Sequence, residues 1–339
     1  MNEIENKHRR TVLVMGICLI LCVLGSFTLG RYPVSLAELL GVLANRAGLP
    51  VKPFWPSQVE AAVWNIRLPR VVLSVLVGAC LAAAGGAYQG IFQNPMASPD
   101  ILGASAGAGF GAALAILLGA SSAGITIGAF AASLLTVGLV FSVSRHARGD
   151  RVLGLVLAGI MVSSLFQSGT SFLKLVADPN NQLPQITYWL MGSLSGAKWS
   201  DIGFVLLPMC CGLIPLFLLR WQLNVITMGD DEARAMGVDP QKIRLWIAIC
   251  STLVTASAVS VSGMIGWVGL VIPHMMRRLV GSDYRFLMPA SMLSGGIFLL
   301  IVDNVSRAVA GIPIGILTAF IGAPFFLWLI TGKGDHYAH

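Results

Sequence analysis

The sequence predicts an all-α integral membrane protein with about ten transmembrane helices in a single transmembrane domain over residues 1–339. Hydrophobic residues make up 56% of the chain and the mean hydropathy is +0.80, values typical of a polytopic membrane protein and not of a soluble globule. Charged residues are only 11% of the chain, and they gather between apolar runs. These runs are long enough to cross a bilayer as helices.

The first half of the chain is expected to contain five spanning helices. The apolar run at 11–29 has no clear small-residue cleavage site, so we interpret it as a first helix and not as a signal peptide. In the polar connection 31–70, Ser35 and Glu38 have the spacing of a capping box, which predicts a short interfacial helix. Further helices are expected at 71–92, 101–118, 123–143 and 152–175.

The second half begins with another polar segment, at 178–201, and is expected to contain five more helices. They are expected at 202–219, 245–261, 265–280, 287–310 and 314–330. If the amino terminus is cytoplasmic and the spans alternate, 14 of the 22 Lys and Arg lie on the cytoplasmic side. The positive-inside rule then predicts a multi-pass membrane protein with both termini cytoplasmic. The net charge of +7 is interpreted as this loop bias, and no nucleic-acid partner is expected.

A charged island interrupts the apolar pattern at 227–244. Hydrocarbon cannot hold so many charges, so the island must lie in water between two spans. Asp230 or Asp231 is expected to cap a short helix that ends at Gly237, and Asp239 to start a second one. Such a pair of amphipathic helices would form a docking surface; the alternative is a plain solvated connector.

Three arginines, Arg67, Arg70 and Arg307, are expected at the outer face. Fixed guanidinium groups there could pair with carboxylates of an external partner, or they could anchor the chain at lipid headgroups. Asp303 lies one helical turn from Arg307, which predicts an ion pair between them.

The 38 glycines are interpreted mainly as positions of close helix packing. Examples are Gly85, Gly295 and the series Gly103, Gly107 and Gly111. The alternative is that some of them allow helices to break around a transport path.

The end of the second helix carries Gln89, Gln93 and Asn94, and Asn94-Pro95 interrupts it. A polar, kinked turn of this kind fits the narrow end of a conduit, although an ordinary turn between helices has the same composition.

Catalytic and metal-binding patterns are absent from the sequence. It contains no Gly-x-x-x-x-Gly-Lys-Ser/Thr, and its six cysteines lie in apolar runs without metal-site spacing. We therefore expect no enzyme activity, no metal site and no cofactor in this chain. A self-sufficient secondary carrier or channel is the alternative to an externally driven transporter, but such a carrier usually needs more ionisable groups in its spans.

Motifs spread over nearly the whole chain carry a family resemblance. They are Trp64-Asn-Ile-Arg-Leu-Pro-Arg70, Gly78-Ala-x-Leu-Ala-x5-Tyr-Gln89, Gln93-Asn-Pro-Met-Ala-x-Pro99, Ile101-Leu-Gly-Ala-Ser-Ala-Gly107, Tyr188-Trp-Leu-Met-Gly-Ser193, Glu232-Ala-x3-Gly-Val238, Gly266-Trp-Val-Gly-Leu-Val-Ile-Pro-His274 and Ile312-Pro-Ile-Gly-Ile-Leu-Thr-Ala-x-Ile-Gly-Ala-Pro324. In this order they resemble the FecCD-type permeases, the membrane subunits of ABC importers for iron-siderophores, haem and cobalamin.

The resemblance implies a type II ABC importer permease of the bacterial cytoplasmic (inner) membrane that works by alternating access. The implied partners are a second permease subunit, expected to be identical, two ABC ATPase subunits that hold ATP and Mg, and a periplasmic or lipid-anchored substrate-binding protein. A ferric siderophore is the expected substrate, with haem or cobalamin as alternatives.

The resemblance also implies roles for particular residues. Arg67, Arg70 and Arg307 would receive acidic residues of the binding protein. Asn94 and Met96 would form part of a cytoplasmic gate, whose second element is expected near 147–150. Gln167 and Ser171 would line the pathway. The ATPase-coupling residues would be Asp230, Asp231, Glu232, Ala233, Met236, Gly237 and Val238.

Overall fold

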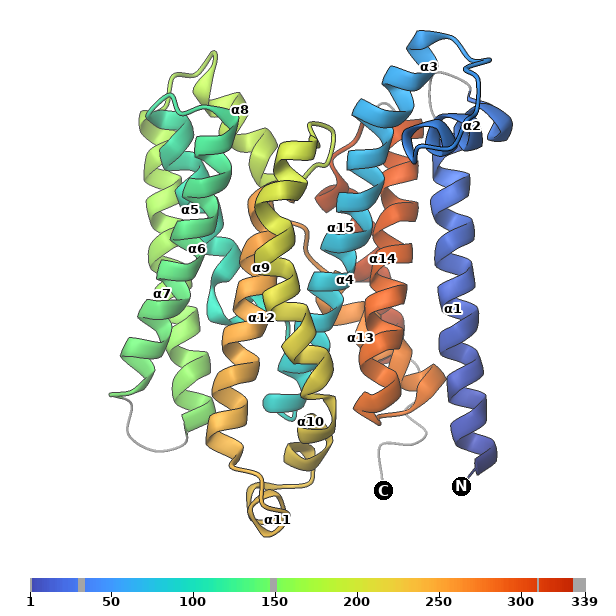
Figure 1. The fold of residues 1–339 in the computed structure, drawn as a ribbon. Helices are drawn as coiled ribbons and strands as arrows, with labels where there is room; N and C mark the ends of the chain where they lie inside the picture. Colours follow the sequence, from blue (N-terminus) through green and yellow to red (C-terminus); the bar gives the residue numbers. More distant parts are fainter. Residues whose placement is uncertain (1, 30–33, 147–150, 310, 332–339) are drawn as a thin grey trace.

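The chain folds into a bundle of long helices that run up and down between two ends (Figure 1). The computed structural model describes residues 2–29, 34–146, 151–309 and 311–331, and no strand occurs within these ranges. One end of the bundle carries the start of α1 and the short helix α11, and we name it the α11 end (Figure 1). The opposite end carries α2, α3 and α8, and we name it the α2 end.

All ten predicted helices are confirmed. They are α1 (Asn2–Thr28), α4 (Leu68–Ile91), α5 (Ala104–Leu117), α6 (Ser122–Ser144), α7 (Arg151–Val176), α9 (Trp199–Leu218), α12 (Pro240–Ser262), α13 (Val268–Val280), α14 (Tyr284–Ala308) and α15 (Ile314–Thr331). Within the described residues, 7 helices are long and apolar enough to cross a membrane on their own. The other three, α5, α13 and α15, are shorter or less uniformly apolar, and they lie in the bundle through contacts with neighbouring helices.

Short helices connect the long ones. They are α2 (Leu36–Arg46), α3 (Ser57–Ala61), the π-helical turn η1 (Ala62–Arg67), the 3-10 turn η2 (Pro99–Leu102), α8 (Gln182–Leu190), α10 (Arg220–Thr227) and α11 (Asp230–Ala235). The predicted capping box is confirmed at the start of α2. The Glu38 backbone N–H donates to Ser35 Oγ at 3.2 Å, and the Ser35 N–H donates to Glu38 Oε2 at 2.8 Å.

Helix α4 lies at the centre of the bundle and is mostly buried, whereas α1 stands at its edge (Figure 1). Glycines bring the backbones of α4 and its neighbours into contact. A Cβ added at Gly78 would lie 2.2 Å from the Gly295 carbonyl oxygen, and one at Gly85 would lie 1.8 Å from the Gly269 oxygen. At these positions the glycines serve close packing, as predicted.

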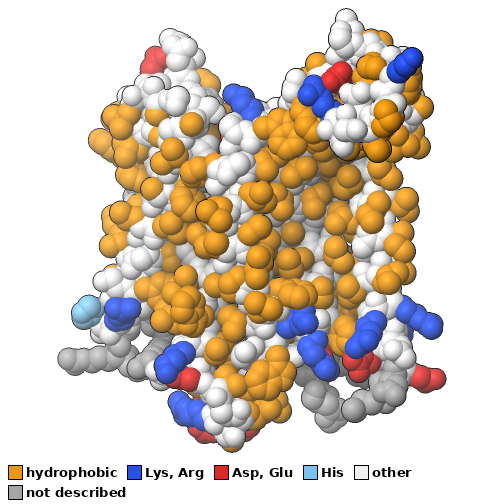
Figure 2. All heavy atoms as spheres, viewed as in Figure 1, with side chains coloured by type: hydrophobic (Ala, Val, Ile, Leu, Met, Phe, Trp, Pro, Cys, Tyr) orange, Lys and Arg blue, Asp and Glu red, His pale blue; other side chains and the backbone are white. Residues whose placement is uncertain are grey.

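On the face shown in Figure 2, a hydrophobic belt covers the bundle between its two ends, and Lys and Arg gather toward the ends. This distribution fits the predicted membrane orientation, in which the α11 end carries the larger share of positive charge. Arg31, Arg148 and Lys333, which enter the count from the sequence, lie outside the described residues.

Candidate functional site

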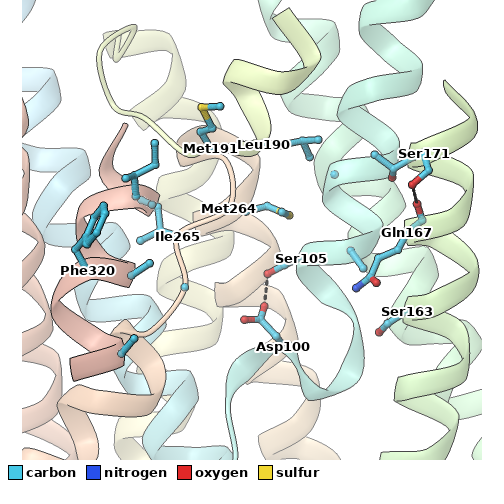
Figure 3. A pocket seen from close by; sticks show the side chains of 18 of the residues that line it. Asp100, Ser105, Ser163, Gln167, Ser171, Leu190, Met191, Met264, Ile265 and Phe320 are labelled. Atoms are coloured by element: carbon cyan, nitrogen blue, oxygen red, sulfur yellow. Dashed lines mark hydrogen bonds between the residues drawn. The ribbon is translucent and has the colours of Figure 1, made fainter. Parts of the chain in front are cut away.

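A cavity of about 1040 Å³ lies between η2, α5, α7, α8, the segment before α13, and α15. Ligand pockets in proteins commonly measure about 300–1,000 Å³, so this one has room for a large molecule. Its two walls differ in character (Figure 3). Polar lining residues are Asp100, Ser105, Ser163, Gln167, Thr170 and Ser171, and apolar lining residues include Leu190, Met191, Met264, Ile265 and Phe320.

Helix α7 contributes much of the polar wall. Ser163, Gln167 and Ser171 follow one another at intervals of four residues, a spacing that places all three on one face of a helix. The Ser171 hydroxyl donates to the backbone carbonyl oxygen of Gln167 at 3.0 Å, and the Gln167 side chain points toward the cavity (Figure 3). The structure thus places both predicted lining residues, Gln167 and Ser171, in the cavity wall.

Asp100 is a lining residue that the sequence analysis missed, because it directly precedes the helix expected at 101–118 and belongs to no motif of charged residues. Ser98 caps η2 by accepting from the Asp100 backbone N–H at 3.1 Å. The Ser105 hydroxyl donates to the Asp100 carboxylate (Figure 3). The sequence feature that could have identified Asp100 is its position as an acidic residue directly after Ser98-Pro99, at the start of an apolar stretch.

The turn at 92–98 connects α4 to η2 and so leads directly to the cavity. It contains both predicted gate residues: the Asn94 side chain accepts from the Met96 backbone N–H at 2.9 Å, and both residues are exposed. Gln93 has a left-handed backbone with φ of 47°, and its side chain donates to the Ile226 carbonyl on α10 at 3.0 Å. The predicted second gate element, at 147–150, lies outside the described residues.

The charged island forms α11, together with the end of α10 and the start of α12. The expected cap at Asp230 or Asp231 is wrong, because Gly229 is the N-cap. Asp230 instead accepts two hydrogen bonds from Arg244, at 2.6 and 3.0 Å, and these bonds lower the pKa of its carboxyl group. Gly237, with φ of 78°, follows the end of α11 as predicted.

The second short helix expected after Asp239 is also wrong in extent. Asp239 caps a helix, but that helix is α12, which continues without a break to Ser262. No glycine or proline lies between Pro240 and Gly263 to stop the helix. Its charged first turns therefore extend a spanning helix into water.

The predicted coupling residues divide into a buried set and an exposed set. Ala233 and Val238 pack against Val225 and are buried. The Asp231 side chain is 93% exposed, and Met236 is 49% exposed. The first set therefore holds α11 against the bundle, and the second set, with the exposed Glu232, presents a face to solvent.

The three predicted outer arginines lie toward the α2 end, near Asp303. Arg70 Nη2 lies 2.8 Å from Asp303 Oδ1, and Arg307 Nε lies 3.4 Å from Asp303 Oδ2, so the predicted Asp303–Arg307 pair is confirmed. Arg67 donates to the carbonyl oxygen of Phe27. The side chains of Arg70 and Arg307 are 13% and 11% exposed, so this arginine cluster is largely covered and not a set of free surface cations.

Within the described ranges, no group of three or more His, Cys, Asp and Glu side chains could hold a metal ion. The described geometry thus offers a large two-sided cavity, a turn beneath it that is tied to α10, and an exposed short helix at the α11 end.

Comparison with known proteins identifies close relatives along the whole chain. A model of the FecCD transport family matches residues 18–332. The molybdate import system permease protein MolB of Haemophilus influenzae is 38% identical over 93% of this chain and 94% of its own length. The hemin transport system permease protein HmuU of Yersinia pestis is 37% identical over 95% of this chain and 96% of its own.

A solved structure shares the fold. It shows a transporter assigned to the metal-chelate ABC type in an inward-facing conformation, with a TM-score of 0.85 and 35% sequence identity. The match covers 95% of this chain and 99% of that one.

Proposed function

The chain belongs to the FecCD transport family, and we propose that it is the permease subunit of an ATP-driven importer that moves a metal chelate from the outer face of a bacterial cytoplasmic membrane into the cell. The observation that carries this proposal is the cavity of about 1040 Å³, which lies in a fold shared with a metal-chelate type transporter. Named relatives import molybdate or hemin, so the family alone does not set the substrate. The size of the cavity favours a bulky chelate, such as a ferric siderophore, haem or cobalamin.

Transport would proceed by alternating access between the two membrane faces. The gate turn at 92–98 borders the cavity through η2, and Gln93 ties it to α10, next to α11. A displacement of α11 by a cytoplasmic ATPase would therefore reach the gate turn through one short helix and one hydrogen bond. ATP and Mg would bind on the two ATPase subunits and not on this chain.

A second permease subunit would complete the pathway. Ser164, Gln167, Ser168 and Ser171 are exposed on α7, inside the hydrophobic belt, and Phe320 on α15 is 75% exposed. Polar side chains within a spanning helix normally face protein or a water-filled cavity and not lipid. We assign the covering surface to a second copy of this chain.

The arginine cluster would receive a substrate-binding protein outside the membrane. Two guanidinium groups, those of Arg70 and Arg307, share the single carboxylate of Asp303, and Arg67 bonds a backbone carbonyl at the same end, so the cluster keeps a net positive charge. That charge suits acidic side chains on a partner, which would compete with the internal bonds.

The test is to purify this chain after co-expression with its candidate ATPase subunits and to measure the native mass and the uptake of a radiolabelled ferric chelate into proteoliposomes. We expect two copies of this 35.8 kDa chain with two ATPase subunits, and uptake that requires ATP. Uptake driven without any ATPase would instead favour a secondary carrier and would refute the proposal.

A further inference from the structure

The cavity has an unequal distribution of charge. Of the described residues that line it, Asp100 alone has an ionisable side chain, and the other polar groups are hydroxyls and the Gln167 amide. Among the described residues, no Lys or Arg forms an ion pair with Asp100; its one side-chain partner is the Ser105 hydroxyl. The cavity therefore carries an acidic group without a counter-charge.

The Asp100 carboxylate is directed into the cavity. It lies at the foot of the polar wall, between the apolar wall and α7 (Figure 3). Beside a protein wall, a charge acts more strongly on a neighbouring ligand than it would in bulk water, because less solvent lies between the two. A negative ligand would be repelled, and a positive ligand would be attracted.

The opposite wall is apolar and adaptable. Met191 and Met264 are unbranched and polarisable, and Phe320 offers an aromatic face (Figure 3). A ligand that contacts both walls needs an apolar side for the methionines and Phe320. Its other side needs hydrogen-bond donors for the hydroxyls, the amide and the carboxylate.

We propose that Asp100 makes this cavity a site for bulky neutral or cationic chelates that carry hydrogen-bond donors, and that it disfavours compact oxyanions. The inference rests on the proposed function, because it takes the cavity to be part of the transport path. It separates this chain by chemistry from a permease whose cargo is a small inorganic anion.

Charge-selective labelling in the cavity tests this proposal. In the full chain, with its six native cysteines replaced by serine or alanine, Gln167→Cys provides a thiol in the polar wall. Native membranes are treated with a cationic reagent, 2-(trimethylammonium)ethyl methanethiosulfonate, and an anionic one, 2-sulfonatoethyl methanethiosulfonate. Labelling is done at about pH 8, well above the usual pKa of an aspartate side chain, which is about 3.9. The measured quantity is the cation-to-anion rate ratio, divided by the ratio for a free thiol.

We expect the ratio to fall at least about fivefold when Asp100→Asn is added, because one charge inside the cavity is lost. Ser105→Ala keeps the charge and should keep the ratio. A reporter on the exposed surface of α3, Ser57→Cys, should show no change with Asp100→Asn. If Asp100→Asn reduces the yield of folded protein, the proposal is tested without that variant. With Asp100 in place, the cation-to-anion ratio at Gln167→Cys must exceed the ratio at Ser57→Cys.

Equal ratios with Asp100 and with Asn would overturn the proposal, as would faster reaction with the anionic reagent. Failure of both reagents to reach Gln167→Cys would overturn it too, because the cavity would then not admit water-soluble ligands. The labelling requires no ATP, no ATPase subunit and no binding protein. The absence of ATP-driven uptake would therefore refute the proposed function and leave the labelling result standing.

Discussion

At the scale of single residues, the most consequential contact is the one between Asp303 and its two arginines. The Asp303 side chain is fully buried, and Arg70 and Arg307 both pair with it. Breaking a buried ion pair by removing one partner is costly, because the remaining charge loses its compensation. This carboxylate therefore holds α4 and α14 together at the end where a binding protein is proposed to dock.

We predict that Asp303→Asn destabilises the detergent-purified protein by roughly 3 kcal/mol, because it leaves two largely buried guanidinium groups without a counter-charge. Thermal unfolding measured by circular dichroism checks this prediction. The matched control is Asp231→Asn, whose side chain is 93% exposed and which should change stability by less than about 0.5 kcal/mol. Equal unfolding temperatures for the two variants would contradict this view of the cluster.

At the scale of elements, two features carry the argument: the close helix contacts around α4 and the position of α11. Gly85 allows the α4 backbone to approach the Gly269 carbonyl at the start of α13. Helix α11 is anchored by Ala233 and Val238, and Gly237 follows its end with a positive φ that costs little because glycine has no Cβ. The first feature fixes the packing of the bundle, and the second presents a solvent-facing surface.

We expect Gly85→Ala to cost about 1–3 kcal/mol or more, because the added methyl would overlap backbone atoms that cannot move aside. The measurement is the yield of monodisperse protein together with its unfolding temperature. Gly138→Ala is the control: an added Cβ there meets nothing within 4 Å, so it should leave both quantities unchanged or slightly improved. A tolerant Gly85→Ala variant would show that the α4–α13 contact is looser than described.

For α11, Glu232→Lys should leave the unfolding temperature within about 1 °C of the parent, because the residue is exposed. It should nevertheless abolish ATPase capture and uptake, because it reverses a charge on the proposed coupling surface. Co-purification with the ATPase subunits measures the first effect. The exposed residue Gln58 on α3 supplies the control, since Gln58→Lys makes a similar change at the opposite end. Normal capture by Glu232→Lys would remove α11 from the proposed interface.

At the scale of the whole molecule, the two ends of the bundle differ in charge and are separated by a hydrophobic belt (Figure 2). The positive-inside rule predicts that the α11 end faces the cytoplasm. This orientation is also the one that the proposed mechanism needs, because ATP is cytoplasmic and the arginine cluster must face outward.

Accessibility of engineered thiols in intact cells checks the orientation. In the cysteine-free chain, Ser57→Cys on α3 should react with a membrane-impermeant maleimide added outside. Asp231→Cys on α11 should react only after the membrane is permeabilised. The reverse pattern would falsify the assigned topology and, with it, the direction of import.

The sequence by itself determined the ten helices, the capping box at Ser35 and the water-exposed island around α11, because these depend on apolar run length and on residues within one or two turns of each other. Gln167 and Ser171 were assigned to the pathway through the family resemblance alone, although their four-residue spacing already predicts that they share one face of a helix. Only the tertiary structure showed that Asp100 faces this stripe across the cavity and that Arg70 joins Arg307 at Asp303. These contacts join segments far apart in the chain, and their distances follow from helix packing, which no local pattern encodes.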